Sequence, residues 1–252
     1  MVWGLAAGCA AAGARVATAQ DARPALVAVA ASVQGAMSEV AGAWTRETGL
    51  RLNISYGSSG NLARQIQQGL PAELFLSADE GFALKLAETG LARDVGVIYA
   101  SGRLALIVPK ASTLELDAQL RGLKAGWPSI RKFAIANPEL APYGKAAREI
   151  LQSAGLWEQA QIKLVLGENI GQATQFVTTG AAQAGITALS LLTESDAGRN
   201  SRSIALPDSL HAPLRQRMVL LQRAGPAAIA FYQYLQTAPA KAQLRKHGFT
   251  AG

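Results

Sequence analysis

The sequence is poor in the residues that most enzymes and metal sites use. Its 252 residues include one cysteine, Cys9, and two histidines, His211 and His247. A single cysteine forms neither an intrachain disulfide nor a cysteine-based metal cluster, and the two histidines lack the spacing of a metal-binding helix. No nucleophile elbow, phosphate-binding glycine loop or dinucleotide-binding motif is present. We therefore expect no catalysis, no cofactor and no resident metal.

Long apolar runs and dense basic clusters are also missing. Nothing beyond the N-terminal stretch approaches the ~20 apolar residues that a membrane span needs. The net charge is +7, but the basic residues occur singly or in pairs, as at Arg131-Lys132 and Arg245-Lys246. No aromatic residues interleave with them, so the pattern favours a solvated surface over a nucleic-acid interface. A positive field of this kind attracts anions.

The first twenty residues are typical of an export signal. Residues 1–20 are small and apolar, and Ala17-Thr18-Ala19 offers a cleavage site. Two alternatives stay open: a lipoprotein site at Cys9, or a leader that is not secretory. The first interpretation predicts a periplasmic or otherwise extracytoplasmic protein.

The rest of the chain alternates short apolar runs with amphipathic segments. A buried strand at 26–30 precedes a helical pattern from residue 37, and alternating residues at 50–56 predict a half-buried strand. Two helices close the chain, at about 226–236 and 239–246. This alternation predicts an α/β fold with mainly parallel sheets flanked by helices. The number of units fits two sheets better than one.

Polar residues stand where predicted strands turn into helices. Ser32 follows the first strand, and Ser58 and Ser59 precede the second helix. Tyr143 and Ile170 stand at two later helix starts. The first turn of a helix has unpaired N–H groups and the positive end of the helix dipole, which together bind anions without a cationic side chain. Taken alone, each serine has an ordinary N-cap as its more common role, and the Tyr143 loop is also consistent with a Pro-Gly turn.

Several longer motifs resemble one family, the periplasmic molybdate-binding proteins of ABC importers. The most specific is YGSSGNLARQIQQGLPAELFLSAD at 56–79, in which Glu73 replaces the usual Asp. The others are AVAAS at 28–32, ASGRLALIVPK at 100–110, AIANPELAPYG at 134–144, GENIGQA at 167–173 and FYQYLQTAPAKAQLRKHGF at 231–249. The resemblance covers nearly all of residues 25–250.

This resemblance implies a two-lobed, type II periplasmic-binding-protein fold with the ligand held between the lobes. The first lobe is expected at 25–101 plus 218–252, and the second at 102–217. By the family pattern, Ser32 and Ser59 donate hydrogen bonds to the ligand from the first lobe. From the second lobe, Tyr143 and Ile170 donate through backbone N–H groups. The weaker candidates are Ala31, Ser58 and Ala188.

The resemblance also implies a ligand and partners. The expected ligand is molybdate or tungstate, so that molybdenum enters only as an oxyanion, and the expected partner is a membrane permease with its ATPase. The protein is expected to be a monomer that binds no nucleic acid. Ala188 stands where one branch of the family has a tyrosine that donates through its hydroxyl. Binding of sulfate or another small anion, and a sensor domain that serves no transporter, therefore remain alternatives.

Overall fold

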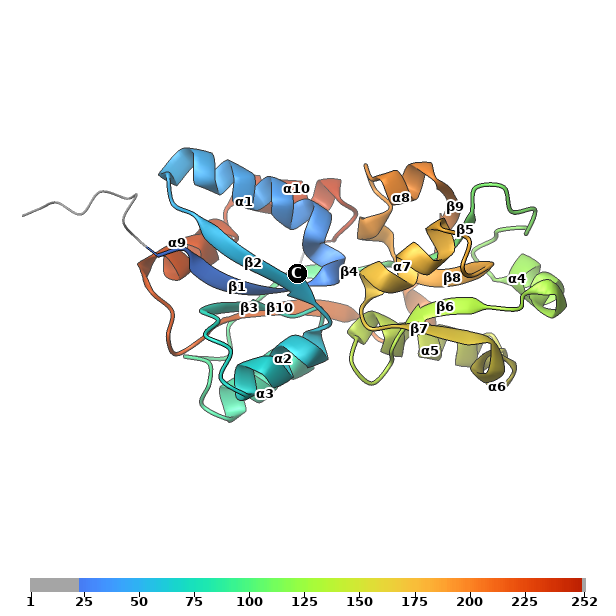
Figure 1. Ribbon diagram of the computed structural model, residues 1–252, viewed down its shortest axis with the longest axis horizontal. Helices are drawn as coiled ribbons and strands as arrows, with labels where there is room; N and C mark the ends of the chain where they lie inside the picture. The colour runs from blue at the N-terminus through green and yellow to red at the C-terminus, as the bar shows by residue number, and fades with distance from the viewer. Residues whose placement is uncertain (1–22, 251–252) are drawn as a thin grey trace, which may run out of the picture.

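Residues 23–250 are described by a computed structural model, in which two α/β lobes lie side by side (Figure 1). The predicted signal at 1–20 lies outside the described residues. The first lobe contains β1 (Ala25–Ala30), the 3-10 turn η1 (Ala31–Val33), α1 (Gln34–Thr48), β2 (Leu52–Gly57), α2 (Ser59–Gln67), β3 (Leu74–Leu76), α3 (Gly81–Glu88), β4 (Val97–Gly102), β10 (Leu214–Leu220), α9 (Pro226–Tyr234) and α10 (Ala238–Lys246).

The second lobe is built from the middle of the chain. It contains β5 (Leu104–Pro109), α4 (Arg121–Gly126), η2 (Trp127–Ser129), β6 (Phe133–Ala136), α5 (Pro142–Ser153), α6 (Trp157–Ala160), η3 (Gln161–Lys163), β7 (Leu164–Gly167), α7 (Ile170–Thr178), β8 (Ala184–Ala188), η4 (Leu189–Leu191), α8 (Asp196–Arg199), β9 (Ser201–Ala205) and η5 (Asp208–Leu210). No helix among residues 23–250 is long and apolar enough to cross a membrane.

Each lobe has one five-stranded sheet, and the two sheets follow the same plan. The strand orders are β2-β1-β3-β10-β4 and β7-β6-β8-β5-β9. In the first sheet β10 runs antiparallel to both of its neighbours, and in the second β5 does the same. The other pairings are parallel, so four of the five strands in each sheet share a direction. The predicted mainly parallel sheets are confirmed.

Helices cover both faces of each sheet, as the buried strands require. In the first lobe α1, α9 and α10 pack on one face, where Trp44 and Phe231 meet edge to face with ring centroids 5.2 Å apart. Helices α2 and α3 cover the other face. In the second lobe α5 packs on one face and α7 on the other.

The chain passes between the lobes twice. It leaves the first sheet after Gly102 and re-enters it at Leu214, where β10 begins. The predicted return at 218 is therefore four residues late. The apolar end of β10 is predictable from the sequence, but the strand begins with alternating apolar and polar residues that resemble a loop. That correction moves Gln216 into the first lobe.

Candidate functional site

Four strand ends meet where the two lobes face each other. Parallel neighbours β1 and β2 end in register, with Ala30 opposite Gly57, and β6 and β7 end with Ala136 opposite Gly167. The next helical element along the chain after these strands is η1, α2, α5 and α7 respectively, and a short loop separates β6 from α5. In open α/β sheets, ligands bind outside the carboxyl ends of such strands. The topology therefore places the four predicted junctions around one space.

A narrow cavity of about 10 Å³ occupies that space. All but one of its lining residues are buried, and none is charged. The lining consists of Ala30, Ala31, Ser32, Gly57, Ser58, Ser59, Ala78, Ala141, Pro142, Tyr143, Asn169 and Ile170. The space between the closed lobes is narrow, so it suits only a small and compact ligand.

All four principal candidates line this cavity, as do the weaker candidates Ala31 and Ser58. Ala188 does not. It is fully buried at the end of β8, where it pairs with Leu104 of β5. The structure therefore gives Ala188 no place in the cavity wall.

Ser32 contributes an unused hydroxyl. The residue is 1% exposed, and its Oγ has no hydrogen-bond partner among the described residues. The Ser190 hydroxyl, from the second lobe, donates to the Ser32 carbonyl at 2.7 Å. A buried polar group without a partner costs about 1–3 kcal/mol. An anion in the cavity would remove that cost by accepting a hydrogen bond from Ser32.

Ser59 is the first residue of α2, and its hydroxyl already accepts one hydrogen bond. Its Oγ accepts a hydrogen bond from the buried Ala78 N–H at 2.9 Å. The hydroxyl proton is therefore free to be donated. Ser58 differs, because it is the N-cap of α2 and its Oγ accepts from the Asn61 N–H at 3.4 Å. Its side chain has the ordinary capping role that the sequence left open.

Tyr143 and Ile170 bring helix N-termini to the cavity. Tyr143 follows Pro142 in the first turn of α5, and Ile170 begins α7. N–H groups in a first turn have no acceptor within their own helix, and they stand at the positive end of its dipole. The Asn169 side chain caps α7 by accepting from the N–H of Gln172, two residues after Ile170, at 3.1 Å. Both positions suit an anion.

The Tyr143 side chain is also part of the wall. Burial raises the pKa of its hydroxyl well above the ordinary value, while the nearby Ser32, Gln216 and Ser190 side chains oppose the rise. The hydroxyl therefore keeps its proton at physiological pH. The cavity is thus neutral and rich in donors.

Besides the contact of Tyr143 described below, three hydrogen bonds join the lobes around the cavity. The Gly60 N–H donates to the Leu140 carbonyl at 2.8 Å, and the Asn61 amide donates to Glu168 Oε1 at 2.8 Å. The third is the bond from Ser190 to Ser32. These contacts were not predicted from the sequence, because they join residues far apart in the chain that no local pattern relates. They describe lobes closed upon each other.

Gln216, which was not predicted from the sequence either, is fully buried and contacts Tyr143. Its Nε2 donates to the Tyr143 hydroxyl at 3.0 Å, and its Oε1 accepts from the Tyr99 hydroxyl at 2.8 Å. The available signal was the spacing of Leu214, Gln216 and Met218, which period-two alternation places on the same side of a strand.

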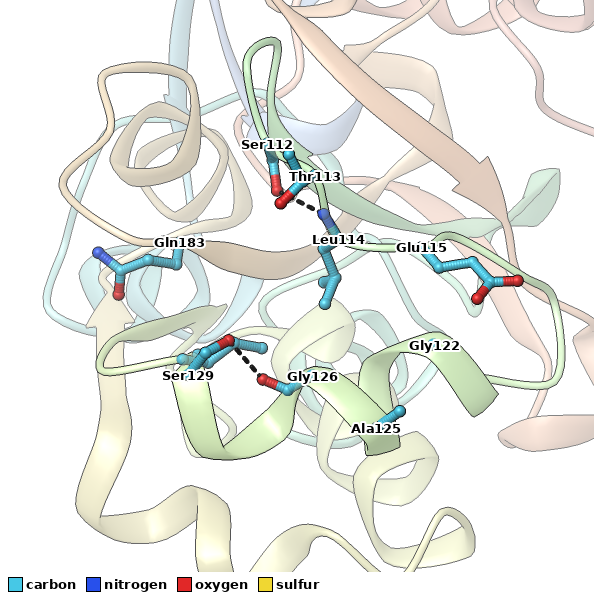
Figure 2. Close-up of a pocket in the computed structure, with 10 residues that line it drawn as sticks. Ser112, Thr113, Leu114, Glu115, Gly122, Ala125, Gly126, Ser129 and Gln183 are labelled. Carbon is cyan, nitrogen blue, oxygen red and sulfur yellow. Dashed lines mark hydrogen bonds between the residues drawn. The ribbon is translucent and has the colours of Figure 1, made fainter.

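A larger hollow of about 380 Å³ lies on the second lobe, between the loop after β5 and α4 (Figure 2). Its polar groups are largely occupied. Ser129 donates to the Gly126 carbonyl at 2.7 Å, and Ser112 accepts from the Leu114 N–H at 3.2 Å. None of the predicted ligand-binding residues lines this hollow. Its larger size therefore does not make it a better candidate for the ligand-binding site.

Across residues 23–250, no group of three His, Cys, Asp or Glu side chains is placed to hold a metal ion.

Fold and site together define a two-lobed binding protein. Residues 25–250 match the bacterial extracellular solute-binding proteins, and the chain belongs to that family. It is 36% identical over 226 residues to the molybdate-binding protein ModA of Azotobacter vinelandii, with 88% of each chain covered. It is 36% identical over 227 residues to ModA of Rhodobacter capsulatus, with 89% of this chain and 87% of the relative covered.

A solved structure gives the same result. The periplasmic molybdate-binding protein of Azotobacter vinelandii matches with a TM-score of 0.83 at 30% identity, covering 90% of this chain and 99% of that one. The predicted family resemblance and the predicted two-lobed fold are both confirmed.

Proposed function

We propose that the protein is the substrate-binding component of an ABC importer and captures molybdate or tungstate between its lobes. The observation that carries this proposal is the small, uncharged, buried cavity at which helix starts from both lobes meet. Its principal ligand donors are Ser32, Ser59, Tyr143 and Ile170. The printed names of the relatives, which are molybdate-binding proteins, support the choice of ligand.

The energies fit such a ligand. Hydrogen bonds to a charged group contribute about 1.5–3 kcal/mol each, so four donors supply about 6–12 kcal/mol. Micromolar binding corresponds to about 8 kcal/mol. The entropy cost of immobilising a small rigid ion and closing the lobes is subtracted from that sum. Helix dipoles add to it. The uncharged site can therefore hold a dianion in the micromolar range or below.

The cellular location and the partners of the protein follow from the same proposal. The protein would act in the periplasm as a monomer and deliver its ligand to a membrane permease driven by an ATPase. Molybdenum would be cargo, carried as the oxyanion. No carboxylate lines the cavity to bind a bare metal cation.

Sulfate is the second candidate ligand. Sulfate is also a fully deprotonated tetrahedral dianion at neutral pH, and it is smaller than molybdate. The narrowness of the cavity, about 10 Å³, favours it. Hydrogen-bond donors alone do not discriminate between sulfate and molybdate, so any preference for one of them must come from the difference in their size.

A thermal-shift panel with molybdate, tungstate, sulfate and phosphate tests the proposal. A ligand at 100 times its Kd stabilises a protein by about 2.7 kcal/mol. For a chain of this size, that corresponds to a rise in Tm of about 5–10 °C. We expect this rise with molybdate and tungstate. A rise with sulfate alone would favour the second candidate, and no rise with any oxyanion would refute both.

A further inference from the structure

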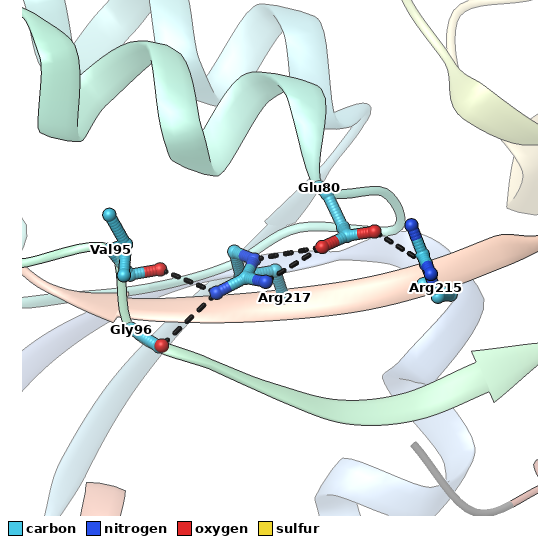
Figure 3. Close-up of polar contacts among 5 residues, drawn as sticks. All are labelled: Glu80, Val95, Gly96, Arg215 and Arg217. Atoms are coloured by element: carbon cyan, nitrogen blue, oxygen red, sulfur yellow. Dashed lines mark hydrogen bonds and ion pairs between the residues drawn. The ribbon is translucent and has the colours of Figure 1, made fainter.

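Two clusters of ion pairs differ in how they are placed relative to the lobes. Around Glu80, both partners, Arg215 and Arg217, belong to the same lobe as the carboxylate (Figure 3). A movement of one lobe against the other therefore leaves these pairs intact. The second cluster, called the Lys246 cluster, has members on both lobes. It consists of Glu39, Glu194, Lys246 and His247.

Lys246, the last residue of α10, lies between two carboxylates. Its Nζ is 2.7 Å from Glu194 Oε2 and 3.5 Å from Glu39 Oε2. Glu39 belongs to α1 of the first lobe, whereas Glu194 lies between η4 and α8 of the second. The hydrogen bond to Glu194 is the largest cause of a raised Lys246 pKa, so the ammonium keeps its charge at physiological pH. One cation is thus shared by a carboxylate of its own lobe and a closer one of the other lobe.

The first-lobe side of this contact is held firmly in place. His247 is buried, and its Nε2 lies 3.0 Å from Glu39 Oε1. Because an ionised carboxylate only accepts hydrogen bonds, the ring donates through Nε2 and fixes Glu39 beside Lys246. The second lobe packs directly against the next residue, since a Cβ atom at Gly248 would lie 3.4 Å from Leu189 Cγ. The end of α10 therefore meets the other lobe in the closed arrangement.

Glu194 has a backbone conformation that is unfavourable for a glutamate. Its φ is 50°, in the left-handed region where a Cβ atom crowds the backbone. The start of α8 does not require the Glu194 side chain, because the Ser195 hydroxyl caps this helix by accepting from the Gly198 N–H at 3.1 Å. Glycine would fit the turn better but would have no carboxylate for Lys246. Strained residues of this kind often serve a function, and here the strain accompanies an ion pair between the lobes.

We propose that Lys246 changes partner when the lobes move, pairing with Glu194 in the closed state and with Glu39 in the open state, and that this exchange sets the rate at which the ligand leaves. The inference rests on the proposed function and deepens it. Opening separates Lys246 from Glu194, so Glu194 favours the closed state. Glu39 has the opposite effect, because it repels Glu194 in the closed state and remains a partner for the ammonium after opening.

The test is the rate of molybdate dissociation, measured by stopped-flow fluorescence at about 0.01 M salt, where charges act over about 30 Å. Glu194→Gln should release molybdate about 1.5- to 5-fold faster than wild type, the range for one exposed ion pair. Glu39→Gln should release it more slowly by a similar factor, because the amide oxygen still accepts from His247 but the negative charge is gone. The matched control is Lys241→Gln, an exposed lysine on the same helix, which should leave the rate unchanged.

Three further measurements separate the exchange from a structural role. The double variant Lys246→Gln/Glu194→Gln should release molybdate at the rate of Glu194→Gln alone, because the two residues act as a pair. About 1 M salt shortens the screening length to about 3 Å and should bring the rates of wild type and Glu194→Gln together. Glu194→Gly should also release molybdate faster, yet urea unfolding of the ligand-free protein should show no loss of stability, because glycine relieves the backbone strain.

The possible results distinguish this inference from the proposed function. Equal rates for wild type and Glu194→Gln at low salt would overturn the inference alone. A faster rate in Glu39→Gln would also overturn it, because Glu39 would then support the closed state instead of competing for Lys246. A wild-type protein that binds no oxyanion would overturn the proposed function and the inference with it.

Discussion

Replacing Ser59 with alanine should damage both ligand binding and folding, for two separable reasons. The Ser59 hydroxyl accepts from the buried Ala78 N–H at 2.9 Å and has its proton left to donate to the ligand. Losing a hydrogen bond to a charged group costs about 1.5–3 kcal/mol, which weakens oxyanion binding about 10- to 100-fold. The unpaired Ala78 N–H lowers the free energy of unfolding by about 1–3 kcal/mol even without ligand.

Two measurements on the same variant distinguish these effects. Titration calorimetry gives the change in Kd, and urea unfolding of the ligand-free protein gives the change in stability. The matched control is Ser58→Ala on the preceding residue. Its loss removes an N-cap and should lower stability by about 0.5–2 kcal/mol while leaving Kd within a few-fold of wild type.

The reverse pattern would refute the reasoning. If Ser58→Ala weakened binding strongly and Ser59→Ala did not, the two serines would have exchanged roles. If Ser59→Ala lowered stability but left the Kd unchanged, the Ser59 hydroxyl would have a structural role only. Ser59 would then have to be removed from the proposed ligand donors.

Three other changes test the closed arrangement and its charges. Gly60→Ala places a Cβ atom 2.8 Å from the Leu140 carbonyl of the other lobe, so the closed state should lose about 1–3 kcal/mol. Small-angle scattering should then show less compaction on adding molybdate than in wild type. Asn61→Ala removes an exposed bond between the lobes, and stopped-flow measurements should show ligand dissociation about 2- to 10-fold faster. Hydrogen bonds from Arg217 lower the pKa of Glu80 below 4.5, so this carboxylate stabilises the fold above pH 4.5 and the contribution is lost as pH falls through the lowered value. Glu80→Gln should therefore be less stable than wild type at neutral pH, and urea unfolding should show the difference shrinking in acid.

Local patterns were enough to predict most of the fold. Apolar runs and alternation located the strands, and Gly49, a glycine with a positive φ of 72°, ends α1 where such a residue is favoured. The error at β10 has a physical cause. Its first half alternates Leu214 and Gln216 with two arginines, which reads as a solvated loop when only continuous apolar runs are sought.

The candidate site was predicted less completely than the fold. Ser32, Ser59, Tyr143 and Ile170 stand at helix starts, which are local features, and they line one cavity. The contacts that close the lobes around the cavity involve residues more than 70 positions apart, and no periodicity encodes them. Likewise, the sequence identifies Ser59 as a residue at a helix start but does not reveal that its hydroxyl accepts a hydrogen bond from the Ala78 N–H.

The first turns of α5 and α7 present main-chain N–H groups to the cavity. Side-chain substitution cannot delete such a group, except by proline. An alanine scan would therefore find few damaging positions and would underestimate how much of the wall contacts the ligand. The same property makes the site tolerant of sequence drift, since isoleucine, valine or alanine at position 170 would present the same N–H. Binding can thus persist in relatives whose cavity side chains have diverged, provided that the backbone path is kept.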